Sequence, residues 1–387
     1  MNYPPITSVM LVVTHACNLR CRYCFVQKEP ETMTLQTAKD VVDFLIGNRQ
    51  NDETPSINFF GGEPLLCWDS IIEPLTRYIR EELKAPFHLS VTTNGTLLTP
   101  ERLAFMKENQ IGMLLSIDGD AKTQDYNRPY ADGRGSFETL RPMLEEIARD
   151  FRPTFRMTTI PATCGNLFAD IQFARSAGFS NFFVVPNIFE EWSTEAWETL
   201  GGEVRKYGDH FIESYENGET PIRFSTFEEA LRNITKINNA VSCGSCRVGC
   251  HAGRKCGLGT ARFASVHPSG DVYACQEMTS NEGQSSIFWI GNIYNGVSEE
   301  RRAALASLFD SKKVTGADCG KCKMRRICDG GCVANNYLVN GDVNRLPTVY
   351  CQWMQMLLNE AIRVMWALSK NERFIAEWRK SYGSPGT

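Results

Sequence analysis

Three cysteines lie close together near the start of the chain: Cys17, Cys21 and Cys24, in a C-x3-C-x2-C spacing. Three thiolates on one short loop can bind three irons of a 4Fe-4S cluster and leave the fourth iron open to a small molecule. A structural zinc ion needs a fourth ligand, and His15 is the only nearby candidate. Because His15 is too close to Cys17 for the usual zinc-finger spacing, the motif favours an iron–sulfur cluster with an open iron.

A second group of cysteines occupies the last third of the chain. Its members are Cys250, Cys256, Cys275, Cys319, Cys322, Cys328, Cys332 and Cys351. Eight thiolates suffice for two fully ligated 4Fe-4S clusters. Two structural zinc sites are the alternative, since a C-x2-C pair suits tetrahedral zinc equally well. The first motif favours iron–sulfur clusters here too.

Four of the fifteen cysteines remain after these eleven. Cys67 and Cys164 each stand alone, and we expect them to be buried as small apolar residues. Cys243 and Cys246 lie just before the second group and could be alternative ligands, a redox pair or incidental.

The composition narrows the class of protein further. The chain has 387 residues, 42% of them hydrophobic, and a net charge of −4, which gives no general attraction to nucleic acid or to an anionic membrane. It contains no apolar run of about 18 residues that would predict a membrane span, and its first residues lack the pattern of a signal peptide. We therefore expect a cytoplasmic protein, in which clustered cysteines bind metal rather than form disulfides.

Alternating short β-rich runs and longer amphipathic stretches fill residues 8 to 190. The expected strands are Ser8–Thr14, Ser56–Phe60, His88–Thr93, Gly112–Ile117, Phe155–Ile160 and Asn181–Pro186. The expected helices are Leu35–Arg49, Trp68–Leu83, Pro100–Asn109, Phe137–Phe151 and Asn166–Ala177. Six β-then-α units in series predict an α/β fold with a parallel sheet, curled as a partial barrel or wound as an open sheet.

The regular alternation of strands and helices ends after residue 190. A helix is expected over Glu195–Glu216, and an amphipathic helix over Gln352–Trp378. The predicted organisation is an α/β domain over residues 1–218, a linker over 219–242, a cysteine-rich domain over 243–351 and a C-terminal helix over 352–387. The cysteine-rich domain has few long periodic segments, so we expect metal to organise it rather than an apolar core.

Polar and glycine-rich segments follow several of the expected strands. The second strand leads into Gly61-Gly62-Glu63-Pro64, the third ends at Thr92-Thr93-Asn94-Gly95, and the fourth includes Ser116. In parallel α/β folds, ligands bind at the carboxyl ends of the strands. Glycines let the backbone approach a ligand closely, and a carboxylate can pair with an ammonium group. Read singly, each segment could be an ordinary turn.

The first motif, with an aromatic residue before its third cysteine, resembles the signature of radical S-adenosylmethionine (SAM) enzymes. The resemblance extends through the eight-cysteine pattern, which is similar to the SPASM domain of radical SAM maturases, and covers residues 8–355. It implies a partial (β/α)6 TIM-like barrel with a small C-terminal iron–sulfur domain. The SAM-contacting residues that it implies are Gly61, Gly62, Glu63, Pro64, Asn94, Ser116 and Val185.

The same resemblance implies three 4Fe-4S clusters. One auxiliary cluster would take Cys250, Cys256, Cys275 and Cys332, and the other Cys319, Cys322, Cys328 and Cys351. Members of this family mostly act on peptides or proteins, and they need an electron donor such as flavodoxin or ferredoxin.

Two activities are compatible with the resemblance. One is a maturase that forms a thioether or carbon–carbon crosslink in a ribosomally synthesised peptide, with or without a separate leader-binding protein. The alternative is an anaerobic sulfatase-maturating enzyme that forms formylglycine. In that subfamily an Asp follows the cysteine that corresponds to Cys275, whereas here Gln276 and Glu277 follow. This departure favours the crosslinking maturase and leaves Glu277 as the candidate catalytic base.

Overall fold

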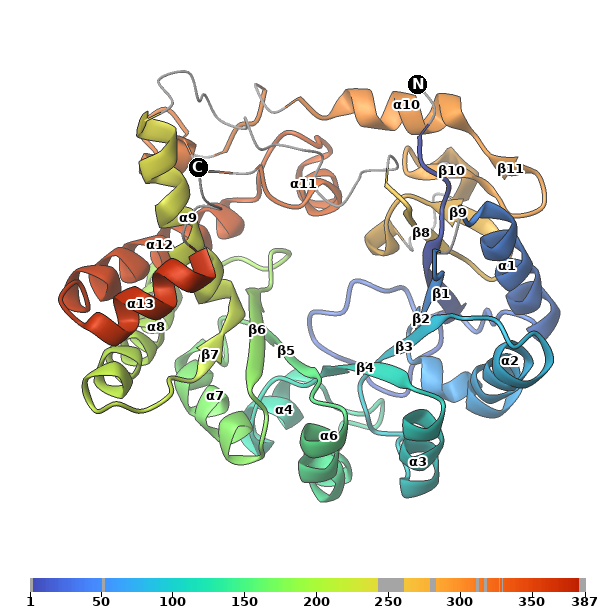
Figure 1. Cartoon of the computed structure of the whole chain (residues 1–387), viewed down its shortest axis with the longest axis horizontal. Helices are drawn as coiled ribbons and strands as arrows, with labels where there is room; N and C mark the ends of the chain where they lie inside the picture. Colours follow the sequence, from blue (N-terminus) through green and yellow to red (C-terminus); the bar gives the residue numbers. More distant parts are fainter. Residues whose placement is uncertain are drawn as a thin grey trace. The chain divides into compact units, whose positions relative to one another are not determined.

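The computed structural model describes residues 3–50, 53–242, 261–278, 283–310, 313–316, 319–326, 328 and 330–382. Figure 1 shows the chain coloured along its sequence. The described residues form two compact units. Unit one comprises the described residues of Met1–Ser116, Arg128–Pro153 and Arg254–Asp310, and unit two those of Ile117–Asn127, Thr154–Gly253 and Ser311–Thr387.

Unit one is built on a run of eight strands in the order β11-β10-β9-β8-β1-β2-β3-β4. The parallel part consists of β1 (Ser8–Thr14), β2 (Ser56–Gly61), β3 (His88–Thr93), β4 (Ile111–Ser116) and β8 (Phe263–Val266). The antiparallel part is β9 (Asp271–Tyr273), β10 (Trp289–Asn292) and β11 (Gly296–Val297). Because β8 pairs with β1, the segment that leads to Cys275 continues the sheet that carries the first cysteine motif.

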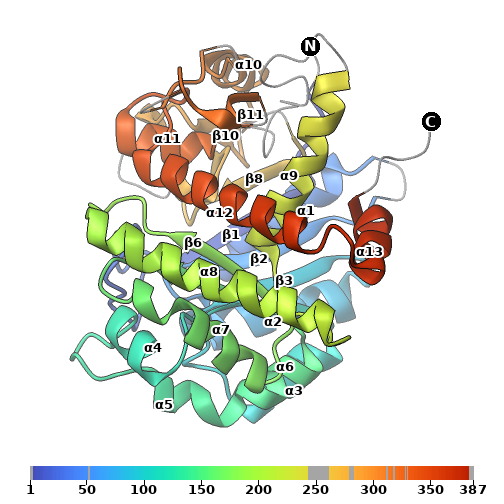
Figure 2. The same ribbon diagram turned by 90° about the vertical axis from the view of Figure 1, so that its left-hand side faces the viewer.

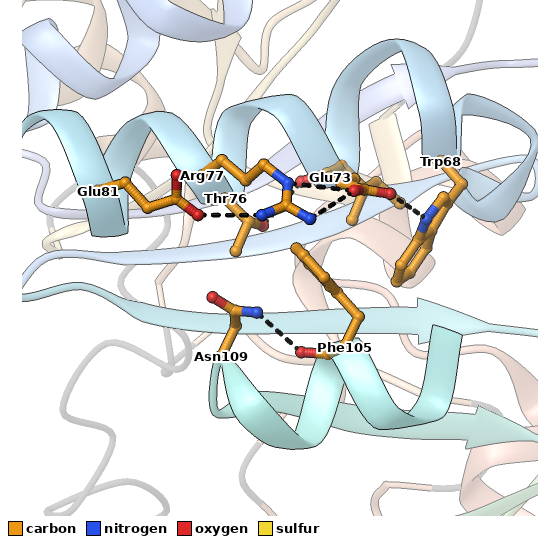
Figure 3. Close-up of polar contacts among 8 residues, drawn as sticks. Trp68, Glu73, Thr76, Arg77, Glu81, Phe105 and Asn109 are labelled. Carbon is orange, nitrogen blue, oxygen red and sulfur yellow. Dashed lines mark hydrogen bonds and ion pairs between the residues drawn. The ribbon is translucent and has the colours of Figure 1, made fainter. Parts of the chain in front are cut away.

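The helices of unit one alternate with its strands. They are α1 (Leu35–Asn48), η1 (Pro64–Cys67), η2 (Trp68–Ile72), α2 (Glu73–Arg77), η3 (Tyr78–Glu82), α3 (Pro100–Glu108), α5 (Phe137–Leu140), η4 (Arg141–Met143), α6 (Leu144–Asp150), η7 (Gln276–Met278), η8 (Gly283–Ser285) and α10 (Glu299–Leu308). Figure 3 shows Arg77 of α2 between Glu73 and Glu81, with its guanidinium 5.1 Å from the centre of the Phe105 ring in α3. The contact of Arg77 with Phe105 joins α2 to α3.

Unit two contains the parallel strands β5 (Thr154–Thr159), β6 (Asn181–Pro186) and β7 (Arg223–Phe224). Its helices are α4 (Ala121–Asn127), η5 (Cys164–Asn166), α7 (Leu167–Ser176), α8 (Thr194–Glu216), α9 (Ser225–Ser242), η9 (Lys323–Arg326), α11 (Val333–Asn340), α12 (Thr348–Ala367) and α13 (Glu372–Tyr382). Figure 2 shows α12 lying along α8 and crossing α9. The buried rings of Tyr207, Phe224, Phe227 and Trp353 pack together between these elements.

The predicted α/β class with a parallel sheet is confirmed, and all six predicted strands lie within one residue of their expected bounds. Two predicted segments differ. The expected linker over 219–242 contains β7 and α9, because Phe227, Ala230 and Leu231 give α9 a buried apolar face. The expected single helix over Gln352–Trp378 is divided into α12 and α13 at Asn371, whose side-chain oxygen accepts a hydrogen bond from the N–H of Phe374.

Among the residues that the structure describes, no helix is long and apolar enough to cross a membrane. The predicted domain bounds at residues 218, 242 and 351 stay predictions.

Candidate functional site

The first cysteine motif forms the loop that follows β1. Cys17, Cys21 and Cys24 are all half-buried, and the N–H of Cys24 donates to the carbonyl of Cys21 at 3.1 Å in a turn. Burial raises the pKa of the Cys17 thiol, although the N–H of Leu19 donates to its sulfur at 3.4 Å. A bound cation would offset that desolvation cost by replacing the proton. The donor set therefore fits a thiolate-ligated cluster.

Hydrogen bonds on both sides hold this loop to unit one. The hydroxyl of Thr14 and the N–H of His15 both donate to the carbonyl of Glu31, at 2.8 and 3.1 Å. The N–H of Arg20 donates to the carbonyl of Pro129 at 2.7 Å. Among the described residues, no three His, Cys, Asp or Glu side chains converge closely enough for a single metal ion.

Gly61 and Gly62 lie directly against the root of the cysteine loop. The N–H of Gly62 donates to the carbonyl of Thr14, and the N–H of Glu63 to the carbonyl of Ala16, both at 2.8 Å. A Cβ atom on Gly62 would lie 2.2 Å from the oxygen of Ala16, and one on Gly61 would lie 2.0 Å from that of Thr14. Gly61 also has φ +141°. The glycines are therefore required by the approach of β2 to the start of the cysteine loop.

Glu63 has a fully buried side chain. Its Oε1 accepts hydrogen bonds from the N–H of Leu65 at 3.0 Å and the hydroxyl of Thr93 at 2.8 Å, and its Oε2 accepts from the N–H of Asn94 at 2.8 Å. Burial nevertheless raises the pKa of Glu63 to about 7, because desolvation outweighs these three donors. Glu63 thus joins the turn after β2 to the turn after β3.

Asn94 extends this connection to the cysteine loop. Its Nδ2 lies 3.0 Å from Oδ1 of Asn18 and 3.9 Å from Sγ of Cys17. Asn18 in turn donates to the hydroxyl of Thr96 at 2.8 Å. The structure therefore brings together five of the predicted SAM-contacting residues around the loop: Gly61, Gly62, Glu63, Pro64 and Asn94. Sequence reasoning missed Asn18 and Thr96, although Asn18 directly follows Cys17.

The remaining predicted SAM contacts lie on later strands. Ser116 is the last residue of β4, which pairs with β3 so that Thr93 is opposite Leu115. Ser116 thus lies at the same edge of the sheet as Thr93. Val185 lies in β6 of unit two and is half-buried.

The turn after β4 is fixed by buried carboxyl groups of unit two. Asp118 accepts a hydrogen bond from the N–H of Thr158 at 2.8 Å. Asp170 accepts from the hydroxyl of Thr123 at 2.8 Å, and a Cβ on Gly119 would lie 2.0 Å from its Oδ1. Burial raises the pKa of Asp170 to about 8. These carboxyl groups accept hydrogen bonds from the backbone N–H groups of Asp120 and Thr158 and so hold the turn in place.

Six of the eight cysteines of the second group lie among the described residues. Cys275 follows β9 in unit one, and Glu277 lies two residues later in η7. A Cβ on Gly316 would lie 2.9 Å from Sγ of Cys351 and 3.5 Å from Sγ of Cys319, so these two sulfurs border the same glycine. The other described members are Cys322, Cys328 and Cys332. Cys243, Cys246, Cys250 and Cys256 lie outside the described residues.

Cys67 and Cys164 are buried, as predicted, with 4% and 2% of their surface exposed. Cys164 also contributes to a cavity of about 620 Å³ in unit two that the sequence did not predict. Its polar lining residues include Lys122, Tyr126, Asn166, Ser193 and Glu195.

Comparison with known proteins identifies the superfamily. Residues 11–167, which contain the cysteine loop, the glycine pair, Glu63 and Asn94, match the radical SAM superfamily. These residues form a radical SAM domain. The radical SAM cyclopropyl synthase TigE of Paramaledivibacter caminithermalis is 23% identical in an alignment of 382 positions that covers 92% of this chain and 74% of that relative. The cysteine-type anaerobic sulfatase-maturating enzyme of Clostridium perfringens is 23% identical over 85% of this chain and 89% of its own length.

Two solved structures are similar in fold to most of this chain. Native anSMEcpe with bound AdoMet and Cp18Cys peptide has a TM-score of 0.70 at 21% identity, covering 95% of this chain and 99% of that chain. Streptococcus suis SuiB bound to precursor peptide SuiA has a TM-score of 0.56 at 16% identity, covering 90% and 76%. At these identities the likeness shows the fold alone, and it supports the predicted radical SAM fold with a cysteine-rich C-terminal region.

Proposed function

We propose that this chain is a radical SAM maturase that abstracts a hydrogen atom from a peptide through a 5′-deoxyadenosyl radical. The product is a thioether or carbon–carbon crosslink in a ribosomally synthesised peptide. The observation that carries the proposal is the loop of Cys17, Cys21 and Cys24, which is hydrogen-bonded to the ends of β2 and β3. When bound there, a reduced 4Fe-4S cluster supplies the electron that cleaves SAM.

The proposed SAM site lies at the edge of the sheet where β2, β3 and β4 end. Gly61, Gly62, Glu63 and Pro64 end β2, Asn94 follows β3, and Ser116 ends β4. These are the carboxyl ends of neighbouring parallel strands, where α/β folds bind their ligands. Val185 is the proposed neighbour of the adenine. In this structure the carboxylate of Glu63 bonds to Leu65, Thr93 and Asn94, so its contact with the amino group of SAM stays a prediction.

Two auxiliary 4Fe-4S clusters are proposed for the second group of cysteines. One would be held by Cys250, Cys256, Cys275 and Cys332, and the other by Cys319, Cys322, Cys328 and Cys351. The shared position of the Cys319 and Cys351 sulfurs beside Gly316 supports the second set. An auxiliary cluster could accept the electron that must leave the substrate after hydrogen abstraction.

A peptide or protein is the proposed substrate. Two proteins of similar fold were solved with peptides, one of them a precursor peptide. The cavity in unit two, at the carboxyl end of β5, offers Tyr126 and Lys122 for contacts with a substrate side chain. The reaction also needs a low-potential electron donor such as flavodoxin or ferredoxin, and leader recognition could require a separate protein.

The second candidate is a sulfatase-maturating enzyme, which the relative from Clostridium perfringens favours. In that case Glu277, two residues after Cys275, is the candidate base that takes a proton from the substrate. The presence of Gln276 rather than an acid directly after Cys275 argues for the crosslinking reaction.

Mass spectrometry of the products would separate the two activities. The anaerobically reconstituted enzyme, with SAM and dithionite, would be given a short cysteine-rich peptide encoded next to it or a sulfatase-derived Cys peptide. The triple variant Cys17→Ala/Cys21→Ala/Cys24→Ala is the matched control. The proposal expects the neighbouring peptide to lose two hydrogens and gain a crosslink. Conversion of Cys to an aldehyde in the sulfatase peptide, with no crosslink in the other, would establish the second candidate instead.

A further inference from the structure

The side-chain amide of Asn94 has only one orientation that satisfies its neighbours. Its Oδ1 accepts hydrogen bonds from the N–H of Thr96 at 3.0 Å and from the hydroxyl of Thr96 at 2.6 Å. A backbone N–H can only donate, so the oxygen of the amide must face Thr96. The nitrogen therefore faces the opposite way, toward the cysteine loop.

Asn18 completes this hydrogen-bond network, and its bonds require the same orientation of the Asn94 amide. Its Oδ1 accepts from Nδ2 of Asn94 at 3.0 Å, and its Nδ2 donates to the hydroxyl of Thr96 at 2.8 Å. The Thr96 hydroxyl can accept that bond because its own proton goes to Asn94. One of the two Nδ2 hydrogens of Asn94 is thus used by Asn18. The second hydrogen is left for Sγ of Cys17, at 3.9 Å.

A hydrogen bond from its backbone also fixes the position of Asn94. Its backbone N–H donates to Oε2 of the fully buried Glu63 at 2.8 Å, and only 7% of Asn94 is exposed. Water therefore competes little for the amide hydrogens. A donor held in place inside a protein interacts more strongly with charge than the same donor in water.

We infer that Asn94 is a positioning residue that donates a hydrogen bond to the Cys17 thiolate and thereby raises the reduction potential of the SAM-cleaving cluster. Reduction adds one electron, supplied by flavodoxin, ferredoxin or dithionite, and part of that negative charge falls on the ligating sulfurs. A hydrogen bond to a sulfur stabilises the reduced state more than the oxidised state, which is how such bonds tune cluster potentials. This inference rests on the proposed function, because it requires a cluster on Cys17, Cys21 and Cys24.

Two substitutions at Asn94 test the inference. Asn94→Leu keeps a similar shape but removes the donor, and Asn94→Asp replaces the nitrogen by an oxygen that faces Cys17. Asn58→Leu is the matched control, since Asn58 also joins neighbouring strands, through Ser90 and Thr92, without contacting a cysteine. The readout is a redox titration of each reconstituted full-length protein followed by electron paramagnetic resonance, using the cluster signal that changes when SAM is added.

We expect Asn94→Leu to lower the ratio of reduced to oxidised cluster about tenfold at a fixed potential, equivalent to a negative shift of about 59 mV for one electron. Asn94→Asp should shift it further, and Asn58→Leu should match the wild type. A wild-type potential in either Asn94 variant overturns the inference. Failure of both variants to bind iron, with normal loading of Asn58→Leu, also overturns it, because Asn94 would then hold the cluster rather than set its potential. Absence of a SAM-responsive cluster in the wild type would instead refute the proposed function.

Discussion

Gly62→Ala should damage the cysteine loop, although the change adds a single methyl group. The new Cβ would lie 2.2 Å from the oxygen of Ala16 and 2.5 Å from that of His15. Real Cβ atoms are essentially never closer than 3.0 Å to such atoms, so the two backbone segments must separate by about 1 Å. They cannot do so freely, because two hydrogen bonds of 2.8 Å join the same segments.

The energetic cost follows from these contacts. Overpacking costs about 1–3 kcal/mol, and a strained or lost hydrogen bond adds about 1 kcal/mol, so we expect about 2–4 kcal/mol of destabilisation. Gly47→Ala is the matched control. Gly47 is exposed in α1, and a Cβ added there would have nothing within 4 Å, so alanine should stabilise the helix by about 0.5–1 kcal/mol.

Anaerobic urea unfolding followed by circular dichroism would measure both free energies, and iron analysis after reconstitution would measure loading. Because Ala16 precedes Cys17, we expect Gly62→Ala to lose iron from the first cluster, whereas Gly47→Ala keeps it. Wild-type stability and full iron content in Gly62→Ala would refute the claim that the glycine is required by the loop.

Three further predictions concern other parts of the molecule. Glu63→Ala leaves three buried donors without an acceptor, so it should cost about 3 kcal/mol or more in urea unfolding, and a loss below 1 kcal/mol would contradict its role in holding Asn94. Burial raises the pKa of Asp170 to about 8 in the folded protein, whereas in the unfolded chain this carboxyl group has its ordinary pKa of 3.8. Between these two pH values the folded protein therefore binds one more proton than the unfolded chain. The stability of the wild type should therefore fall by about 1.4 kcal/mol per pH unit between pH 5 and 8 relative to Asp170→Asn, and parallel pH profiles would disprove this. Variants Cys322→Ala or Cys328→Ala that stay folded should still form 5′-deoxyadenosine but no modified substrate, and a normal product yield in a variant shown by Mössbauer spectroscopy to lack both auxiliary clusters would rule out an electron-accepting role.

The strands and most helices could be predicted because their signals are local. The strands of the βα units alternate or form short apolar runs, and caps such as Thr99 before Pro100 mark helix starts. The helix α9 was missed because it follows Pro221 and a two-residue strand, outside the regular alternation. Its apolar face is explained only by the tertiary packing of Phe227 against Tyr207.

Only those parts of the site that lie within one short sequence motif could be predicted. The cysteine loop and Gly61–Pro64 carry their chemistry in adjacent residues. The hydrogen bond between Asn94 and Asn18 joins residues 76 positions apart, and it depends on the register of β1, β2 and β3. The role of the two glycines was also only partly predictable, since the backbone that they approach belongs to the end of β1 and the residues just after it.

The central claim is that Cys17, Cys21 and Cys24 hold the cluster that cleaves SAM. The direct measurement is 5′-deoxyadenosine formation by the reconstituted enzyme with dithionite, together with its iron content. We expect about twelve irons and steady cleavage in the wild type, and about eight irons with no cleavage in Cys17→Ala/Cys21→Ala/Cys24→Ala. Continued cleavage of SAM by the triple variant would contradict the assignment of the site.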